Sequence, residues 1–242
     1  STDKKIKIQL RRFARDLGII YTDMKGNQGI AAAQNVGVSR ALDMGAQHVI
    51  FFDQDSILDK VALDVLCDNV TSSSRSVFSI TPGVYREVAL NSGIRDLMSS
   101  GSGCSIDTMQ SVGLFEEGLF IDCVDYEWGW RCLSNGVELV QIRAGCFQHI
   151  LGSSDLRLWG FKARIDSPSR LYYQYRNIII MCRRDYVPFI WKLTQIVKSL
   201  GKIILILMLS NERKIRLDLV IKGVRDGFAG ILGPVEHKEI QL

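Results

Sequence analysis

Hydrophobic and polar positions along the chain follow two periods, one typical of helices and one typical of short buried strands. The expected helices cover residues 3–16, 30–42, 57–70, 107–112 and 125–135, and the expected strands cover 18–21, 48–52, 77–80 and 137–142. Residues 88–97 are polar and irregular, residues 99–103 are expected to form a flexible loop, and from residue 171 onward the pattern is helical and apolar. This alternation of helices and strands predicts an α/β fold with a mostly parallel, doubly wound sheet.

The apolar segment 189–209 is long enough to raise the question of a membrane span. Lys198 and Lys202 argue against a span, because a lysine near the centre of a membrane helix costs about 2.5–3.5 kcal/mol. Four polar side chains fall on one helical face: Lys192, Gln195, Ser199 and Lys202. Apolar residues cover the other face, and basic residues suited to anionic lipid follow. We therefore expect 181–242 to be an amphipathic extension that lies in the plane of a membrane, packs on the core, or forms a dimer.

Composition and charge narrow the class of protein. The chain has 242 residues, of which 47% are hydrophobic, so it can form one large domain with an extension. A formal net charge of +4 without an aromatic and basic stripe does not favour nucleic-acid binding. The six cysteines show no zinc-ligand spacing and are typical of a reducing cytosol. We place a catalytic domain at 1–180 and expect it in the cytoplasm.

The chain opens at Ser1 directly into a charged helical stretch. An α/β domain normally begins with a buried strand, and no strand pattern precedes this helix. We therefore expect the first strands of the domain to be absent from this chain.

A short apolar run, residues 49–52, ends in two carboxylates, Asp53 and Asp55. Open α/β sheets place their ligands at the C-terminal ends of strands. A spacing of two residues on an extended chain points both side chains to the same side. Two close carboxylates repel each other, and a divalent cation bound together with a substrate phosphate would remove that repulsion. The pattern therefore predicts a metal site, and a solvated turn at the strand end is the alternative.

Small residues follow a turn signal between Asn27 and Gly37. Small side chains such as Gly29 allow close backbone approach, and amides at a helix N-terminus suit phosphate or polar groups. The segment could hold part of a ligand, or its small residues could only allow a helix to pack tightly on the sheet.

An acidic cluster lies at the start of the helix expected near residue 125. It contains Asp122, Asp125, Glu127 and the aromatic Trp128. One acid can serve as a helix cap that interacts with the macrodipole, but capping does not explain three acids. A carboxylate that faces the Asp53 and Asp55 site could take a proton from an attacking sugar hydroxyl.

Two later features add candidate residues. His149 ends an expected strand and opens a loop, where it could reach a metal or phosphate or be structural. The segment 170–177 combines tyrosines with Arg170 and Arg176. Aromatic faces such as Tyr173 stack on sugars and arginines bind phosphate in a bidentate way, whereas the alternative is a helix with buried tyrosines.

These features occur in a recognisable order: Asn27-x-Gly29-x-Ala31-x-Ala33-x-Asn35-x-Gly37, Phe52-Asp53-Gln54-Asp55-Ser56, Asp122-Cys123-Val124-Asp125-Tyr126-Glu127-Trp128, His149, and Arg170-x-Tyr172-Tyr173-x-x-Arg176-Asn177. Together they resemble the family 2 inverting glycosyltransferases. The greatest similarity is to the bacterial rhamnosyltransferase branch that builds surface polysaccharides such as O antigen, and it runs over most of the chain.

The resemblance implies a GT-A fold, a nucleotide-sugar donor (dTDP-L-rhamnose in that branch) and Mg²⁺ or Mn²⁺. By position, Asp53 would lie near the ribose of the donor and Asp55 would ligate the metal. Asp125 matches the catalytic base of the family's acidic motif. Asn27 and Asn35 match positions that line the donor pocket.

The remaining candidates complete the expected site. Gly29 and Gln54 join the donor pocket, and His149 joins the metal. Six residues are expected to contact the acceptor or a phosphate: Asp122, Glu127, Trp128, Arg170, Tyr173 and Arg176.

One departure from the family concerns the N-terminus. Family members start with a strand carrying a Thr-Tyr-Asn-Pro-like motif and a second strand that ends in Asp-Asn-Gly-Ser. Ser1 is similar to that last serine. The absent strands would contribute to the nucleotide-base pocket, so we expect the activity of this chain to depend on them.

The resemblance predicts transfer of a sugar to a hydroxyl of a lipid-linked or polysaccharide acceptor, on the cytoplasmic face of the inner membrane. Two other functions stay open at this point. A haloacid dehalogenase-type phosphatase also places Asp-x-Asp after a strand, although its motif normally opens the domain. An inactive fragment would bind nucleotide sugar without transferring it.

Overall fold

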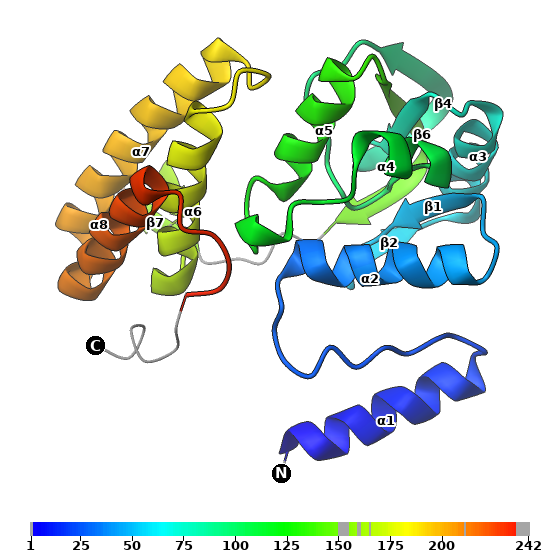
Figure 1. Ribbon diagram of the computed structural model, residues 1–242, viewed down its shortest axis with the longest axis horizontal. Helices are drawn as coiled ribbons and strands as arrows, with labels where there is room; N and C mark the ends of the chain where they lie inside the picture. The colour runs from blue at the N-terminus through cyan, green and yellow to red at the C-terminus, as the bar shows by residue number, and fades with distance from the viewer. Residues whose placement is uncertain (1, 150–154, 159–160, 165, 211, 236–242) are drawn as a thin grey trace.

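The structure is a computed structural model that describes residues 2–149, 155–158, 161–164, 166–210 and 212–235 (Figure 1). Its helices are α1 (Thr2–Asp16), α2 (Ile30–Asp43), α3 (Lys60–Ser72), α4 (Ile106–Val112), the 3₁₀ helix η1 (Glu117–Leu119), α5 (Val124–Ser134), α6 (Pro168–Cys182), α7 (Phe189–Leu209) and α8 (Arg213–Ala229). Its strands are β1 (His48–Phe51), β2 (Ser56–Leu58), β3 (Ser76–Ile80), β4 (Gly83–Ser92), β5 (Ser102–Ser105), β6 (Glu138–His149), β7 (Asp155–Leu158) and β8 (Phe161–Arg164).

The central sheet has the order β1-β5-β3-β6-β2, with β4 also paired to β6. β5 runs antiparallel to both β1 and β3, so β1, β3 and β6 point the same way. Among the described strands only β3 and β6 form a parallel pair, so the α/β fold is confirmed but the sheet is mixed rather than mostly parallel. Strand β5 was not predicted, because Ser102–Ser105 consists of small residues without the large apolar side chains typical of a buried strand. At Gly103 a Cβ atom would lie 2.7 Å from the Val49 carbonyl oxygen, so close strand pairing requires glycine.

Three segments have a secondary structure that differs from the one expected. Residues 18–21, although described, form no strand, and their side chains Ile19 and Ile20 are exposed. The short strand β2 occupies the start of the helix expected at 57–70, and Asp59 caps α3 by accepting from the Ala62 amide at 2.7 Å. The segment expected to be irregular at 88–97 contributes to β4, an edge strand whose mostly exposed side chains are polar and apolar in no regular alternation.

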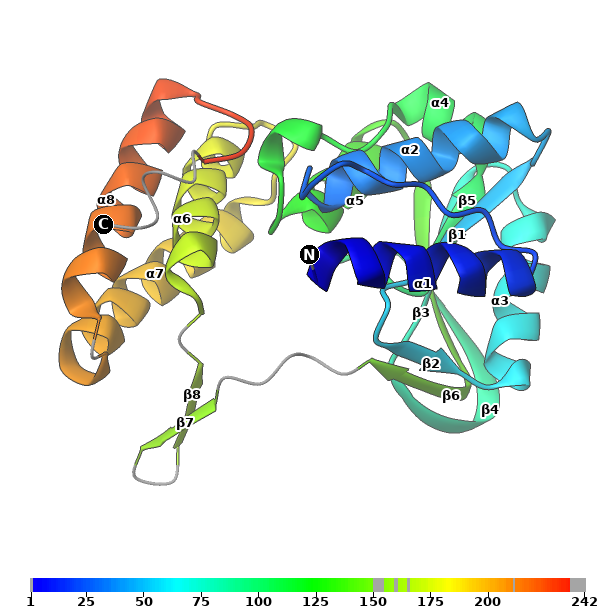
Figure 2. The ribbon, with the colours of Figure 1, turned by 90° about the horizontal axis from the view of Figure 1, so that it is seen from below.

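Helices cover both faces of the sheet (Figures 1 and 2). On one face α3 packs against β3 and β6 through a cluster that includes Leu66, Ile80 and Ile142. On the other face α2, α4 and α5 share a larger cluster that includes Met109 and Trp128. These two apolar layers fix β1 and the start of α5, which carry the carboxylates discussed below.

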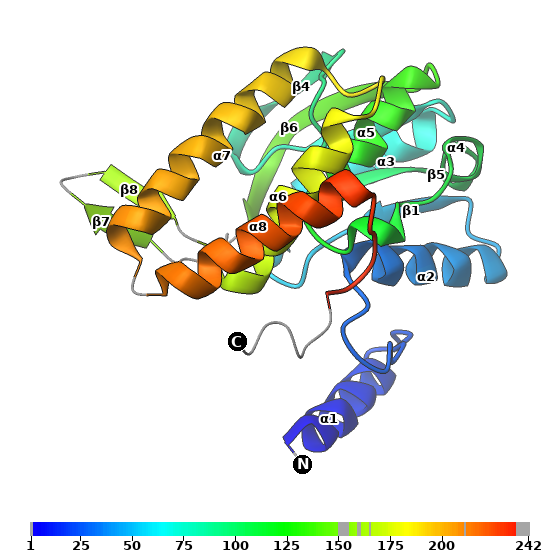
Figure 3. The same ribbon diagram turned by 60° about the vertical axis from the view of Figure 1, so that its left-hand side comes forward.

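Helices α6, α7 and α8 pack together beside the sheet (Figure 3). α8 approaches α6 so closely that a Cβ atom at Gly223 would lie 2.5 Å from the Tyr172 carbonyl oxygen. A Cβ atom at Gly227 would lie 2.8 Å from the Arg176 carbonyl oxygen. Among the described helices, none is long and apolar enough to cross a membrane. The boundary predicted at residue 180 falls inside α6, so α6 links the sheet domain to the helical extension.

Candidate functional site

A cleft of about 1340 Å³ opens at the C-terminal end of β1. Ligand pockets typically measure about 300–1,000 Å³, so this cleft has room for two substrates side by side. Its walls come from four places: the inner face of α2, the turn after β1, the loop before β5, and the start of α5 with the first turn of α6. The polar lining residues are Gln34, His48, Asp53, Gln54, Asp55, Ser99, Ser100, Asp122, Asp125, Tyr126 and Arg170.

The turn after β1 brings Asp53, Gln54 and Asp55 to the cleft, as predicted. Asp53 and Asp55 are half-buried. The turn is anchored to the loop before β5, because the Asp53 amide donates to Ser100 Oγ at 3.1 Å and the hydroxyls of Ser56 and Ser100 lie 2.6 Å apart. The serine-rich loop that looked flexible in the sequence therefore fixes the carboxylate turn.

The chain before α5 adopts a conformation that L-residues rarely take. Phe120, Asp122 and Cys123 have φ values of 65°, 61° and 64°, and none of them is glycine. Such residues cost of order 1–3 kcal/mol each and persist only where the surroundings enforce them, often at functional sites. Here the bend turns the chain into α5 and presents Asp122 and Asp125 to the cleft.

Two buried side chains of α6 hold this bend in place. The Asn177 side-chain amide donates to the carbonyl oxygens of Leu119, Ile121 and Asp122 at 3.0, 2.7 and 2.9 Å. The neighbouring Arg176 donates to the carbonyl oxygens of Gly118 and Leu119 at 2.9 and 3.0 Å, and to that of Gly233.

This arrangement corrects the prediction that Arg176 contacts a phosphate or the acceptor. Its side chain is fully buried, its guanidinium is committed to backbone carbonyls, and it is absent from the described lining of the cleft. Tyr173 is also a packing residue. Its ring stacks on Phe120 with centroids 4.7 Å apart, and its hydroxyl accepts from the Val235 amide.

Asp125 is a half-buried carboxylate that faces the cleft. Burial raises the pKa of Asp125 to about 6, and the negative charge of Asp122 contributes in the same direction. The backbone amides of Tyr126 and Ser99 lower this pKa and only partly offset the burial. A carboxylate that titrates near neutral pH is suited to take a proton in a reaction, as the sequence predicted for this position.

Arg170 and Asp122 form an ion pair on the wall of the cleft. The Arg170 Nη2 atom lies 2.8 Å from Asp122 Oδ1, and its Nε atom donates to both carboxylate oxygens at 3.2 Å. Asp166 lies on the other side of the guanidinium at 4.0 Å. The side chain of Arg170 is 39% exposed, so its charge reaches the cleft.

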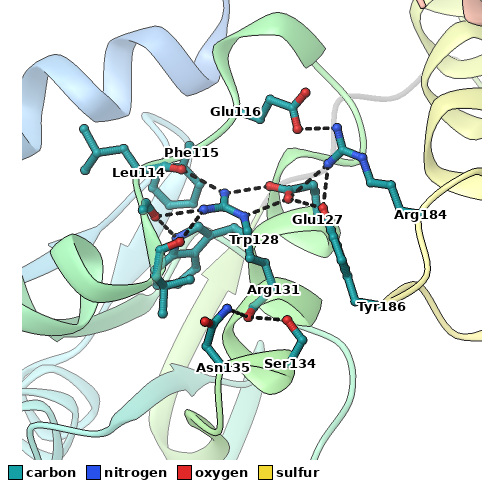
Figure 4. Close-up of polar contacts among 12 residues, drawn as sticks. Leu114, Phe115, Glu116, Glu127, Trp128, Arg131, Ser134, Asn135, Arg184 and Tyr186 are labelled. Atoms are coloured by element: carbon teal, nitrogen blue, oxygen red, sulfur yellow. Dashed lines mark hydrogen bonds and ion pairs between the residues drawn. The ribbon is translucent and has the colours of Figure 1, made fainter.

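Glu127 and Trp128 are not among the described residues that line the cleft. Figure 4 shows the polar contacts that they make instead. Glu127 is 1% exposed and binds Arg131 through two hydrogen bonds of 2.8 Å. It also binds Arg184 at 3.0 Å and the Tyr186 hydroxyl at 2.7 Å. Trp128 is buried and donates to the Gly113 carbonyl oxygen. Both residues are structural, which corrects their prediction as acceptor or phosphate contacts.

The small-residue segment divides between two roles: Ala33 and Gly37 line the cleft, whereas Asn27, Gly29 and Asn35 support the site from behind. Asn27 accepts from the Gly29 amide at 3.0 Å, and a Cβ atom at Gly29 would lie 2.5 Å from the Phe120 carbonyl oxygen. Asn35 is buried and exchanges two hydrogen bonds with the backbone of Phe115. The described lining of the cleft does not include Asn27, Gly29 or Asn35. Tight packing therefore explains these three residues better than contact with the sugar donor.

Gln34, one helical position before Asn35, lines the cleft in its place. Its Nε2 atom donates to Ser99 Oγ at 2.5 Å, and its buried Oε1 atom has no hydrogen-bond partner within the described residues. An unsatisfied buried acceptor is costly and is expected to bind a ligand donor or a water. The helical spacing of Ile30, Gln34 and Ala41 on one face of α2 was the signal that could have found it.

The predicted metal ligands include His149, whose side chain lies outside the described residues. Within the described residues, no three His, Cys, Asp or Glu side chains converge in a way that could hold a metal ion. Asp53 and Asp55 offer oxygen ligands, which Mg²⁺ and Mn²⁺ prefer. Because Mg²⁺ is usually bound through one or two carboxylates plus substrate phosphates, this donor set fits a metal that enters with a diphosphate.

Comparison with known proteins shows the family of the chain. No model of a protein family matches the chain. dTDP-rhamnosyl transferase RfbF of Shigella flexneri is 31% identical over 254 residues, which span 96% of this chain and 86% of RfbF. The chain therefore belongs to the family 2 glycosyltransferases, in the branch of the bacterial rhamnosyltransferases, as the motifs predicted.

Solved structures of S. aureus TarS share the fold. TarS residues 1–349 in complex with UDP-GlcNAc match with a TM-score of 0.50 at 14% identity, over 96% of this chain and 70% of that chain. A second TarS structure matches with a TM-score of 0.50 at 16% identity, over 96% of this chain and 42% of that one. The GT-A type of fold is thereby confirmed.

Proposed function

We propose that this glycosyltransferase moves L-rhamnose from dTDP-L-rhamnose to a hydroxyl of a surface glycan or its lipid-linked precursor, with inversion at the anomeric carbon. The similarity to RfbF supports the sugar and the nucleotide. The observation that carries the reaction type is the cleft itself. It brings an aspartate of near-neutral pKa, Asp125, into the same space as the carboxylate pair Asp53 and Asp55.

The donor would occupy the side of the cleft between β1 and α2. Asp55 would hold Mg²⁺ or Mn²⁺ together with the donor diphosphate, and Asp53 would face the ribose. His149 stays a predicted further ligand. When bound, such an ion supplies positive charge beside the leaving diphosphate. The Gln34 Oε1 atom supports this placement, since it offers an acceptor to a donor hydroxyl or base.

Asp125 would act as the general base. The acceptor hydroxyl attacks the anomeric carbon from the face opposite the diphosphate, and its proton passes to the Asp125 carboxylate. The new bond joins the acceptor oxygen to the anomeric carbon as the bond to the diphosphate oxygen breaks. One base suffices, so the displacement needs no covalent sugar–enzyme intermediate.

Arg170 would contact a negatively charged part of a substrate. Its guanidinium is held by Asp122 on one side and by Asp166 on the other, and it is still partly exposed to the cleft. Such a fixed cation can orient a phosphate without losing its ion pair, because a guanidinium carries five donors. The predicted acceptor contacts of Asp122 and Arg170 therefore remain part of the proposal.

Donor selection tests this proposal. The chain is incubated with Mn²⁺, an acceptor glycan and either dTDP-L-rhamnose, UDP-glucose or UDP-GlcNAc, and products are analysed by mass spectrometry and NMR. We expect transfer from dTDP-L-rhamnose alone and an anomeric configuration opposite to that of the donor. Retention of configuration, or preferred transfer from a UDP-sugar, would overturn the mechanism or the donor respectively.

A separate measurement tests the alternative that the chain is a phosphatase. A haloacid dehalogenase-type enzyme would release inorganic phosphate from simple phosphoesters without any acceptor. The relationship to RfbF argues against this outcome. Binding of dTDP in calorimetry without any transfer of sugar would in turn indicate a fragment that binds nucleotide sugar only.

A further inference from the structure

Helix α7 packs on the protein through polar side chains along most of its length and through the buried Ile206 near its C-terminal end. The Tyr175 hydroxyl of α6 donates to the Ser199 carbonyl oxygen at 2.7 Å. The Lys202 ammonium donates to Gln174 Oε1 at 2.8 Å and to Asp166 Oδ2 at 2.9 Å. These contacts turn the polar face of α7 inward, toward α6 and the cleft.

The apolar side of α7 consequently faces outward. Nine apolar side chains are between 46% and 78% exposed: Phe189, Ile190, Leu193, Ile196, Val197, Leu200, Ile204, Leu207 and Met208. We call this set the outer face of α7. A surface helix of a globular protein normally does the reverse and buries its apolar stripe against the core. A contiguous exposed apolar face of this kind marks an interaction site.

The helices that carry and flank the outer face have a net positive charge. α7 contains three lysines and no acidic residue. Together α7 and α8, residues 189–229, carry eight basic and three acidic side chains, a net charge of +5. Arg213 extends this charge to the C-terminal end of the outer face, because its guanidinium donates to the carbonyl oxygens of Ser210 and Met208 at 2.9 and 3.4 Å.

We propose that the outer face of α7 docks on the surface of an anionic lipid bilayer, with the helix axis in the plane of the membrane. Apolar side chains would enter the boundary between headgroups and acyl chains, and the basic side chains would interact with anionic headgroups. Positive charge around the face favours this partner over a second copy of the chain, whose own outer face carries the same charge.

Docking in this way would place the cleft on the inner side of α7, away from the bilayer. Lys202 of α7 binds Asp166, which lies 4.0 Å from Arg170, and Arg170 lines the cleft. The glycan end of a lipid-linked acceptor could then extend past α7 to the base while its lipid stays in the bilayer. This last step rests on the proposed function, whereas lipid binding does not.

Vesicle flotation tests the docking. The full chain is mixed with vesicles of phosphatidylcholine alone or with about one-third phosphatidylglycerol. We expect binding to the anionic vesicles, weakened at high salt, and an approximately tenfold or greater loss in the double variant Ile196→Asp, Leu200→Asp. Leu90→Asp, which changes an equally exposed leucine on β4, serves as the matched control and should bind as the unmodified chain does.

A second variant tests whether another surface, that of α1, binds the vesicles instead. Helix α1 is basic and also exposes apolar residues, among them Phe13 at 62%. If Phe13→Asp abolishes vesicle binding and the α7 variant does not, the proposal is wrong. Absence of binding to either vesicle would also overturn it. So would self-association in light scattering that the α7 variant removes, since a second copy would then cover the face.

The variant also separates docking from chemistry. Circular dichroism and calorimetry with dTDP should be unchanged in the α7 variant, because the outer face contributes no residue to the cleft. Transfer to a water-soluble acceptor should be retained, and transfer to a lipid-linked acceptor in vesicles should fall about tenfold. Failure of the soluble reaction in the unmodified chain would instead contradict the proposed function.

Discussion

The first turn of α5 carries two carboxylates, Asp125 and Glu127, that have opposite surroundings. Asp125 faces the cleft, and burial raises its pKa to about 6. Among the described residues, no cationic side chain counteracts this shift. Glu127, two residues later, is bound by Arg131, Arg184 and Tyr186 on the far side of the helix. Two residues rotate a helix by about 200°, so neighbouring acids face opposite ways.

The difference shows what distinguishes a reactive carboxylate from a structural one. An acid that is surrounded by fixed cations is stabilised as the anion and holds elements together. An acid that is desolvated without a cation binds a proton readily and can exchange it with a substrate. Composition alone cannot tell the two apart, and the following predictions test the distinction.

The largest expected effect is on catalysis. Asp125→Asn removes the proposed base and should lower kcat by about 10²–10⁴-fold, the usual contribution of a general base. Calorimetry should show that dTDP-rhamnose binds within about twofold of its original affinity. Asp43→Asn, on an exposed surface, is the matched control. More than a tenth of the original kcat in Asp125→Asn would show that another group accepts the proton.

Glu127→Ala should have the largest effect on stability. Removing one partner of a buried ion pair leaves uncompensated charge on Arg131 and Arg184 and costs about 3–5 kcal/mol. Urea unfolding should show this loss, with Glu138→Ala, an exposed acid, as the control. An unfolding free energy within about 0.5 kcal/mol of the original would mean that Glu127 is not structural.

Asn177→Ala tests whether the bend before α5 must be held for Asp125 to act. The carbonyl oxygens of Ile121 and Asp122 lose the Asn177 donor, whereas that of Leu119 keeps its hydrogen bond from Arg176. We therefore expect a loss of about 1–3 kcal/mol in stability. kcat should fall more than KM rises, because the proposed base moves while the turn that carries Asp53 and Asp55 is untouched. Asn177→Asp is the shape-matched comparison, since it cannot donate to these carbonyls. Normal kcat in a folded Asn177→Ala variant would separate the bend from catalysis.

The pH dependence gives the smallest effect but the most specific one. Because the folded state raises the pKa of Asp125 from 3.8 to about 6, its carboxylate opposes folding above pH 6, and this cost disappears as the pH falls toward 4. Asp125→Asn should therefore raise the Tm at pH 7.5, and the gain should shrink as the pH falls toward 4, because asparagine carries no charge at either pH.

The same titration should appear in the rate. kcat should decrease about tenfold per pH unit below pH 6, as the base becomes protonated. Glu127→Gln should lower the Tm at pH 7.5, in the direction opposite to Asp125→Asn. If both variants shift the Tm in the same direction, the contrast between the two carboxylates is incorrect.

Local patterns predicted much of the fold and the centre of the site. The apolar run ending at Asp53 and the acidic helix start at Asp125 were both found from sequence, and both line the cleft. Small or polar stretches concealed β4 and β5, because their strand character comes from pairing with β6, β1 and β3 rather than from their own side chains. The mixed sheet therefore could not be predicted.

The role of an individual side chain depends on which side of its helix it is on and on how deeply it is buried. Gln34 and Asn35 are adjacent on α2, yet one faces the cleft and the other holds Phe115. Arg170 and Arg176 lie on the same helix, and only the former reaches the cleft. A residue type that suits a ligand also suits a buried backbone carbonyl, so sequence left both roles open.

The sequence by itself determined the family, the α/β class, the carboxylate turn and the base candidate, because these depend on the order of short motifs along the chain. Only the tertiary structure decided which polar groups meet a substrate and which hold the backbone. It also decided that α7 turns its apolar face outward, since an amphipathic pattern gives a helix two faces without saying which one the protein covers. The physical reason is that burial is a property of the neighbours, and distant segments supply them.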